Sequence, residues 1–121
     1  MTSIEAQIEE ALTEVDSVEP GSYQLGTPEL PETDALQNLV GMGTAAVPHL
    51  LARLGDEQPS KRVAVIVRAL SRIGYRPALE DVTKVLARYE RRHPKNAWDY
   101  AVIGQCRLAI ERLRDDRTPA G

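Results

Sequence analysis

The chain of 121 residues contains no phenylalanine, one tryptophan and one cysteine. Without phenylalanine, aliphatic side chains must fill most of the core that a hydrophobic fraction of 42% supports. The single cysteine, Cys106, excludes an internal disulfide bond and favours a reducing, cytoplasmic location. The length predicts one domain.

Long apolar runs are also missing. The longest strictly aliphatic run covers residues 63–67, whereas a transmembrane helix needs about 20 apolar residues. The start of the chain, MTSIEAQIEE, has neither the basic residues nor the apolar stretch of a secretory signal. We therefore expect no membrane segment and no secretion.

Basic residues are absent from the first part of the chain. Residues 1–34 contain nine acids and no Lys or Arg, whereas residues 35–121 contain nine acids and 15 bases, so −9 and +6 sum to −3. Such an asymmetry is typical of an interaction arm. The alternative is that the acids form a solvated face or pack on the basic part of their own chain. The candidate contacts for a basic protein partner in this arm are Glu5, Glu9 and Asp16.

Apolar side chains in residues 1–17 recur at helical spacing. They predict one amphipathic, acidic helix whose buried stripe consists of Ile4, Ile8, Leu12 and Val15.

The next part of the chain, residues 18–31, holds three prolines and two glycines. This composition predicts a connector without regular structure. Helical spacing resumes in residues 32–114. Residues 115–121 are expected to fray as a tail.

The β-branched run at residues 63–67 is compatible with a buried strand as well as with a helix. Its apolar series continues through Leu70 and Ile73 without a turn signal, and residues 60–73 have the length of a helix. Gly74 then predicts a left-handed residue at a helix end. We interpret the segment as a helix, which makes the predicted fold all-α.

Residues 41–46 read GMGTAA and fit the pattern G-x-G-x-x-G/A of a dinucleotide-binding turn. That turn needs a strand before the first glycine and an acidic residue about twenty positions later. The preceding segment has helical spacing instead, and Arg62 stands where the acid is required. We therefore predict a corner between two helices and no cofactor.

Two segments have a similar pattern, LVGMGTAAVPHLLARL and LSRIGYRPALEDVTKVL, and their glycines Gly43 and Gly74 are 31 residues apart. Each segment has the pattern of an apolar helix, a glycine turn, a proline and a second apolar helix. The beginning of a third unit is indicated by Ala-Val-Ile at residues 101–103, which also occurs at residues 64–66. Internal periodicity of this kind is typical of stacked helix pairs.

This pattern over residues 34–114 resembles the HEAT-like repeat family, in its short-period form of the phycobilin-lyase type. The most specific match is Pro48, followed by Asp56 and Arg62 at intervals of eight and fourteen residues. The resemblance implies a small α-solenoid in which the helix of residues 1–17 caps one end. It also implies that Asp56 and Arg62 make structural polar contacts between units.

Residues suited to catalysis do not form a recognisable set. His49 and His93 are the only histidines, and no zinc or serine-hydrolase motif accompanies them. The acid pair Glu80–Asp81 falls in the first turn of a helix, where it complements the helix dipole. We predict no catalytic residue, no metal ligand and no cofactor-binding residue.

A basic series near residue 90 offers a second candidate surface, formed by Lys84, Arg88, Arg91, Arg92 and Lys95. Three of these residues step by four and three and share one helix face, which Arg68, Arg72 and Arg76 of the preceding helix could extend. The acidic isoelectric point, about 5.4, and the absence of interleaved aromatics favour a protein partner over nucleic acid. We therefore predict a non-catalytic protein-binding module, an adaptor or an immunity protein that neutralises a toxin. Nucleic-acid binding through residues 84–95 is the alternative.

Overall fold

The structure is a computed structural model, and it describes residues 3–16, 23–24, 27–28, 34–55, 58–93 and 95–114. Within these residues the chain forms six α-helices, which confirms the all-α prediction: α1 (Ile4–Asp16), α2 (Asp34–Gly41), α3 (Val47–Ala52), α4 (Ser60–Ile73), α5 (Leu79–Glu90) and α6 (Ala97–Arg114). Two short 3-10 helices, Gly43–Ala46 and Arg76–Ala78, lead into α3 and α5.

A two-residue antiparallel ladder lies in the connector that was expected to lack regular structure. Strand β1 (Tyr23–Gln24) pairs with β2 (Thr27–Pro28), with Tyr23 opposite Pro28. Strand β2 also contacts α6. Two-residue strands carry no alternating hydrophobic pattern, so the composition of residues 18–31 could not reveal them. The remainder of this connector lies outside the described residues.

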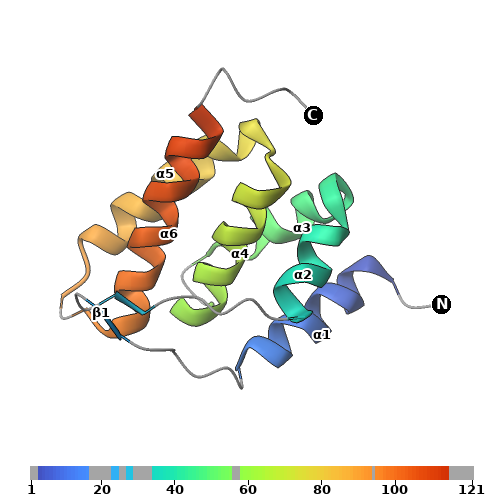
Figure 1. Ribbon diagram of the computed structural model, residues 1–121, viewed down its shortest axis with the longest axis horizontal. Helices are drawn as coiled ribbons and strands as arrows, with labels where there is room; N and C mark the ends of the chain where they lie inside the picture. The colour runs from blue at the N-terminus through green and yellow to red at the C-terminus, as the bar shows by residue number, and fades with distance from the viewer. Residues whose placement is uncertain are drawn as a thin grey trace.

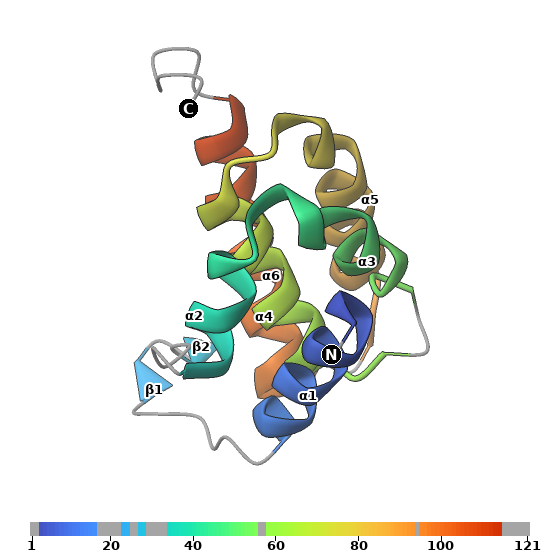
Figure 2. The ribbon, with the colours of Figure 1, turned by 90° about the vertical axis from the view of Figure 1, so that its right-hand side faces the viewer.

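Helix α4 occupies the centre of the molecule. It packs against α6 on one side and α2 on the other, and Figure 1 shows these three helices side by side. Helix α5 packs along α6. Figure 2 shows α3 and α5 on the side of α4 opposite to α2.

Helix α1 contributes its apolar stripe to the same core. Ile8, Leu12 and Val15 are buried together with residues of α2 and α4, and Ile4 packs against this core from its edge. The helix contacts α2, α3 and α4. The acidic helix α1 therefore contributes to the folded core. The sequence predicted this helix as a cap on one end of the repeats.

The β-branched run that allowed two readings is helical. Residues 63–67 lie inside α4 and all five are buried, so the continuous apolar run reflects a helix that is covered on more than one side. Gly74 ends this helix in the left-handed conformation with φ of 80°, as predicted.

The GMGTAA segment is a corner between helices. The residues up to Gly41 form α2, where a dinucleotide-binding turn would need a strand. Gly43 has a φ of 64° and starts the 3-10 helix, and Pro48 lies in the first turn of α3. Gly43 allows the chain to turn because glycine adopts a positive φ without strain. Pro48 favours the start of α3 because its φ is fixed near the helical value.

Tyr89 is the largest fully buried side chain of the described core. The guanidinium carbons of Arg92 and Arg88 lie 4.2 and 5.4 Å from the centre of its ring. Its hydroxyl has no hydrogen-bond partner among the described residues. Burying such a group without a partner costs about 1–3 kcal/mol.

Replacing Tyr89 by phenylalanine is therefore expected to raise the free energy of unfolding by about 1 kcal/mol. The substitution removes the hydroxyl and keeps the ring on which the two guanidinium groups lie. Urea denaturation measures the change. The control, Tyr100→Phe, alters a ring that is 47% exposed and should change stability by less than about 0.5 kcal/mol. A loss of stability in Tyr89→Phe would show that the hydroxyl is satisfied in solution.

Candidate binding grooves

Three acids of α1 contact two arginines of the neighbouring helices. Arg62 of α4 donates from Nε and Nη2 to the two carboxylate oxygens of Asp16, at 3.0 and 2.7 Å. Its Nη1 donates to Glu9 at 3.1 Å. Arg53, which ends α3, lies 3.6 Å from Glu5 and 4.0 Å from Glu9. Because both arginine side chains are only 15% exposed, these contacts hold α1 against α3 and α4.

The structure pairs Glu5, Glu9 and Asp16, the candidate contacts for a basic partner, with arginines of the same chain. Their carboxylates face the chain's own arginines, which is the alternative that the charge asymmetry left open. The hydrogen bond from Arg62 is the main cause that lowers the pKa of Asp16, and the same hydrogen bond raises the pKa of Arg62. Asp56, to which the resemblance also gives polar contacts between units, lies outside the described residues.

Reversing Asp16 to lysine is expected to lower the free energy of unfolding by about 1 kcal/mol, because it places like charges beside Arg62 and Lys61. The effect is kept small by solvent, since the Asp16 side chain is 47% exposed. The matched control, Glu10→Lys, makes the same charge change on another face of α1 and should be nearly neutral. Urea denaturation of both variants measures the difference. Equal effects would contradict the pairing of Asp16 with Arg62.

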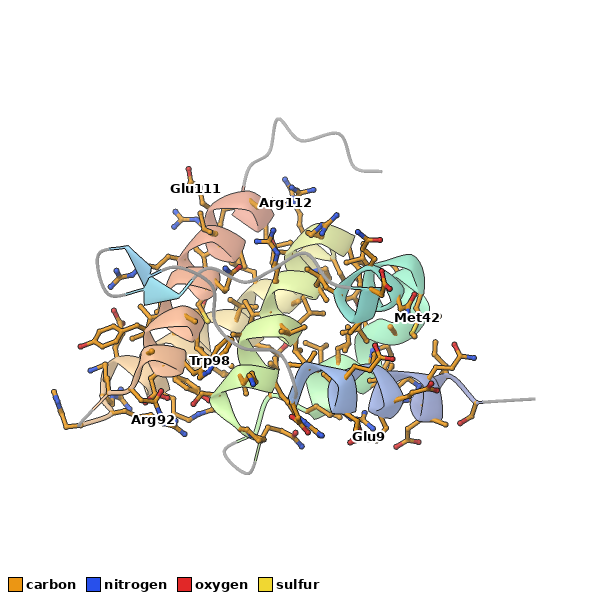
Figure 3. The ribbon with its side chains drawn as sticks, turned by 60° about the horizontal axis from the view of Figure 1, so that its bottom comes forward. Glu9, Met42, Arg92, Trp98, Glu111 and Arg112 are labelled. Carbon is orange, nitrogen blue, oxygen red and sulfur yellow. The ribbon has the colours of Figure 1, made fainter. Side chains whose placement is uncertain are left out.

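The other face of α1 forms one wall of a groove of about 370 Å³, the acidic groove. Its lining comes from α1 and from the end of α2: Gln7, Glu10, Ala11, Glu14, Gln37, Asn38, Gly41 and Met42. In Figure 3, Glu9 and Met42 lie on opposite sides of α1. The acids that contact arginines and the acids of this groove therefore occupy different faces of the helix.

The sequence did not single out Glu10 and Glu14. Their spacing of four residues places them one turn apart on the same face, which is the available sequence signal. The spacing does not show that this face of α1 lies beside α2, whose amide side chains Gln37 and Asn38 line the same groove.

The five basic residues predicted to form one surface are divided by the fold. Arg88 donates to the backbone carbonyl oxygen of Leu54 at 2.6 Å. Lys95 donates to the backbone carbonyls of Glu90 and Arg92 at 3.0 and 2.8 Å. These two cations therefore hold loops and helix ends in place.

Arg92 belongs to a buried polar cluster around Asp99. The Asp99 carboxylate accepts hydrogen bonds from Ser60 at 2.5 Å, from Arg92 at 3.0 Å and from the backbone N–H of Asn96 at 3.0 Å. Burial is the largest single influence and raises the pKa of Asp99, but the three donors together outweigh it and the net pKa is lowered. The cluster connects the start of α4 with the α5–α6 junction.

The other two members of the basic series, Lys84 and Arg91, are exposed. Lys84 lies 3.4 Å from Glu80, one turn earlier on α5. Of the five residues in the series, Lys84 and Arg91 are therefore the exposed ones, whereas Arg88, Arg92 and Lys95 are partly buried by contacts with the protein itself.

A second groove, of about 670 Å³, lies between α4 and α6 and is called the basic groove below. Its lining residues are Arg68, Ser71, Arg72, Gln105, Leu108, Glu111 and Arg112. Figure 3 shows Glu111 and Arg112 on the last turns of α6. The packing of α4 on α6 brings the arginines of both helices together, a juxtaposition that residue spacing within one helix does not predict.

The described part of the chain contains no candidate metal site, no membrane-spanning helix and no reactive thiol. No group of three His, Cys, Asp or Glu side chains in residues that the structure describes is placed to hold a metal ion. None of the described helices combines the length and the apolar character needed to cross a membrane. Cys106 is buried, and its burial raises the pKa of the thiol to about 12, so the thiol stays protonated at neutral pH.

Comparisons with protein-family models, with curated proteins and with solved structures yield no match for this chain. The resemblance to HEAT-like repeats therefore stays a prediction from the residues themselves.

Proposed function

We propose that this chain is a non-catalytic, cytoplasmic protein-binding module built as a short HEAT-like α-solenoid, an adaptor or an immunity protein that neutralises a toxin. Support for the solenoid comes from the contacts of α4, which has α2 on one side and α6 on the other. In stacked helix pairs each unit contacts only its neighbours. In this proposal α1 covers the exposed side of the α2–α4 end.

The observation that carries the proposal is the acidic groove between α1 and α2. Small-molecule sites are mostly apolar and enclose their ligand. This groove is instead lined by two glutamates and three amide side chains along neighbouring helices. Such a surface fits a segment of another protein better than it fits a small metabolite.

The chemistry of the groove favours a partner segment that carries Lys or Arg. Glu10 and Glu14 supply negative charge one turn apart, and Gln37 and Asn38 offer amide donors and acceptors. Met42 supplies an adaptable apolar side chain for the methylene groups of a long basic residue. Long-range attraction between such charges accelerates association.

The proposal is tested by a photo-crosslinking amino acid at Asn38, an exposed position of the groove, in the cells that naturally express the protein. We expect a discrete adduct with a protein, crosslinked through a segment rich in Lys and Arg. The same crosslinker at exposed Lys84 on α5 should not capture this partner. Capture of the partner at Lys84 alone, or no protein adduct at Asn38, would contradict the proposal.

The nucleic-acid alternative rests on Lys84 and Arg91, the exposed remainder of the basic series. Affinity for nucleic acid rises with the number of phosphate contacts and falls steeply with salt. Two exposed cations support few such contacts. Binding to duplex DNA at physiological salt and micromolar protein, lost in Lys84→Glu plus Arg91→Glu, would favour this alternative over the protein partner.

A further inference from the structure

We propose that the basic groove between α4 and α6 binds a protein segment in which carboxylates flank an apolar side chain. This site is separate from the acidic groove, and it takes a partner segment of the opposite charge. The inference therefore stands whether or not the acidic groove captures a basic partner.

The groove takes its three arginines from two helices. Arg68 and Arg72 are one turn apart on α4, and Leu108 and Arg112 are one turn apart on α6. Because α4 and α6 pack along one another, the leucine lines the same groove as arginines that come from both helices. Ser71 and Gln105 add polar side chains to the lining of the groove.

Leu108 indicates that the ligand has an apolar part. Its side chain is 57% exposed, the highest value among the large hydrophobic residues in the described part of the chain, where Tyr100 follows at 47%. Covering apolar surface is worth about 25 cal/mol for each Å² removed from water. A leucine or similar side chain of a partner would remove this surface from water, and the methylene stems of the neighbouring arginines would extend the apolar contact.

The arginines indicate that the ligand also carries carboxylates. A guanidinium group presents a planar fork of N–H donors that matches a carboxylate with two parallel hydrogen bonds. Arg72 and Arg112 are exposed, so an incoming carboxylate reaches them without a change in the core. Charge complementarity therefore selects an acidic segment.

A protein segment satisfies this groove better than nucleic acid does. A phosphate backbone offers no apolar group to cover Leu108, and none of the residues lining the groove is aromatic, so bases have no stacking platform there. Glu111 adds a negative charge to the same groove, which opposes a uniformly charged phosphate chain. An acidic segment with a neutral or basic position near Glu111 avoids this repulsion.

Binding is measured by fluorescence anisotropy with the full chain and a labelled peptide of repeated Glu-Glu-Leu. Peptides of repeated Gln-Gln-Leu and Lys-Lys-Leu serve as controls for the carboxylates and for charge sign. We expect binding of the Glu-Glu-Leu peptide only. Arg72→Glu plus Arg112→Glu should weaken it by about tenfold or more, the equivalent of losing one charge-assisted pair.

The matched control is Lys84→Glu plus Arg91→Glu, which makes the same change in net charge on an exposed residue of α5 and on the exposed residue that follows this helix. It should leave the affinity within about twofold. Leu108→Ser changes an exposed residue without altering charge, and it should weaken binding severalfold. Circular dichroism of each variant checks that the helices are retained.

Three results would overturn the proposal. Equal weakening in the two charge-reversal variants would show that net charge alone attracts the peptide. Binding of a duplex DNA probe that is lost in Arg72→Glu plus Arg112→Glu would assign the groove to nucleic acid. A concentration-dependent dimer, seen by sedimentation and abolished by the same two substitutions, would assign it to a second copy of the chain.

Discussion

Replacing Leu12 by alanine is expected to lower the free energy of unfolding by about 2–5 kcal/mol. Leu12 is fully buried and belongs to the same core cluster as Leu36, Leu39 and Val63. The truncation removes apolar contacts from three helices and leaves a cavity that the surrounding side chains fill only in part. A domain of ordinary stability, about 5–15 kcal/mol, would lose a large fraction of its total.

Leu108→Ala is the matched control, because it makes the same chemical change on an α6 side chain that is 57% exposed. Its effect should stay within about 0.5 kcal/mol. Urea denaturation of both variants gives the comparison. An effect of Leu12→Ala as small as that of the control would mean that α1 is not part of the folded core, and the capping role of this helix would then be wrong.

Replacing Asp99 by alanine is expected to lower the free energy of unfolding by about 3 kcal/mol. Asp99 is only 3% exposed, and its carboxylate accepts hydrogen bonds from Ser60, Arg92 and the backbone of Asn96. The substitution leaves the Arg92 guanidinium without its carboxylate and removes the acceptor of the Asn96 backbone N–H at the start of α6. The estimate lies at the low end of the range for broken buried pairs because the Arg92 side chain is 33% exposed and water can reach it.

The pH dependence of stability gives a second test of the same cluster. The pKa of Asp99 is lower in the folded protein than in the unfolded chain, so its contribution is present above the unfolded pKa, about 3.9, and is lost as pH falls through the lower folded value. The Asp99→Ala variant should therefore lose less stability on acidification than the unmodified protein. Glu80→Ala, whose side chain is 79% exposed, should keep the full acid dependence. Identical acid dependence in all three proteins would contradict the assignment.

The helices could be predicted from the sequence because their signals are local. The apolar residues of α1 repeat at helical spacing within four turns. The apolar series that begins at residues 63–67 continues at helical spacing up to Gly74. The positive φ of Gly74 follows from the residue type and its place after the last apolar position. The short ladder between β1 and β2 has no such local pattern and was missed.

The interaction partners of the charged side chains could not be predicted from the sequence, because they depend on which helices pack against each other. Asp16 and Arg62 are separated by 46 positions in the sequence, and neither residue alone indicates the other as its partner. Helical spacing placed Lys84, Arg88 and Arg91 on one face, yet it could not show that Arg88 reaches the carbonyl oxygen of Leu54. Both grooves are likewise products of helix pairing, so their lining residues appear together only in the folded chain.

The central claim is that α1 divides its acids between two tasks, with Glu9 and Asp16 holding the fold and Glu10 and Glu14 meeting a basic partner. It is tested most directly by the yield of the Asn38 photo-adduct in three forms of the protein. These are the unmodified chain, Glu10→Lys plus Glu14→Lys, and the control Glu80→Lys plus Asp81→Lys, which makes the same change in net charge on α5. We predict that the groove variant loses the adduct by about tenfold or more, whereas the control keeps it. Equal yields in the two variants would contradict the claim.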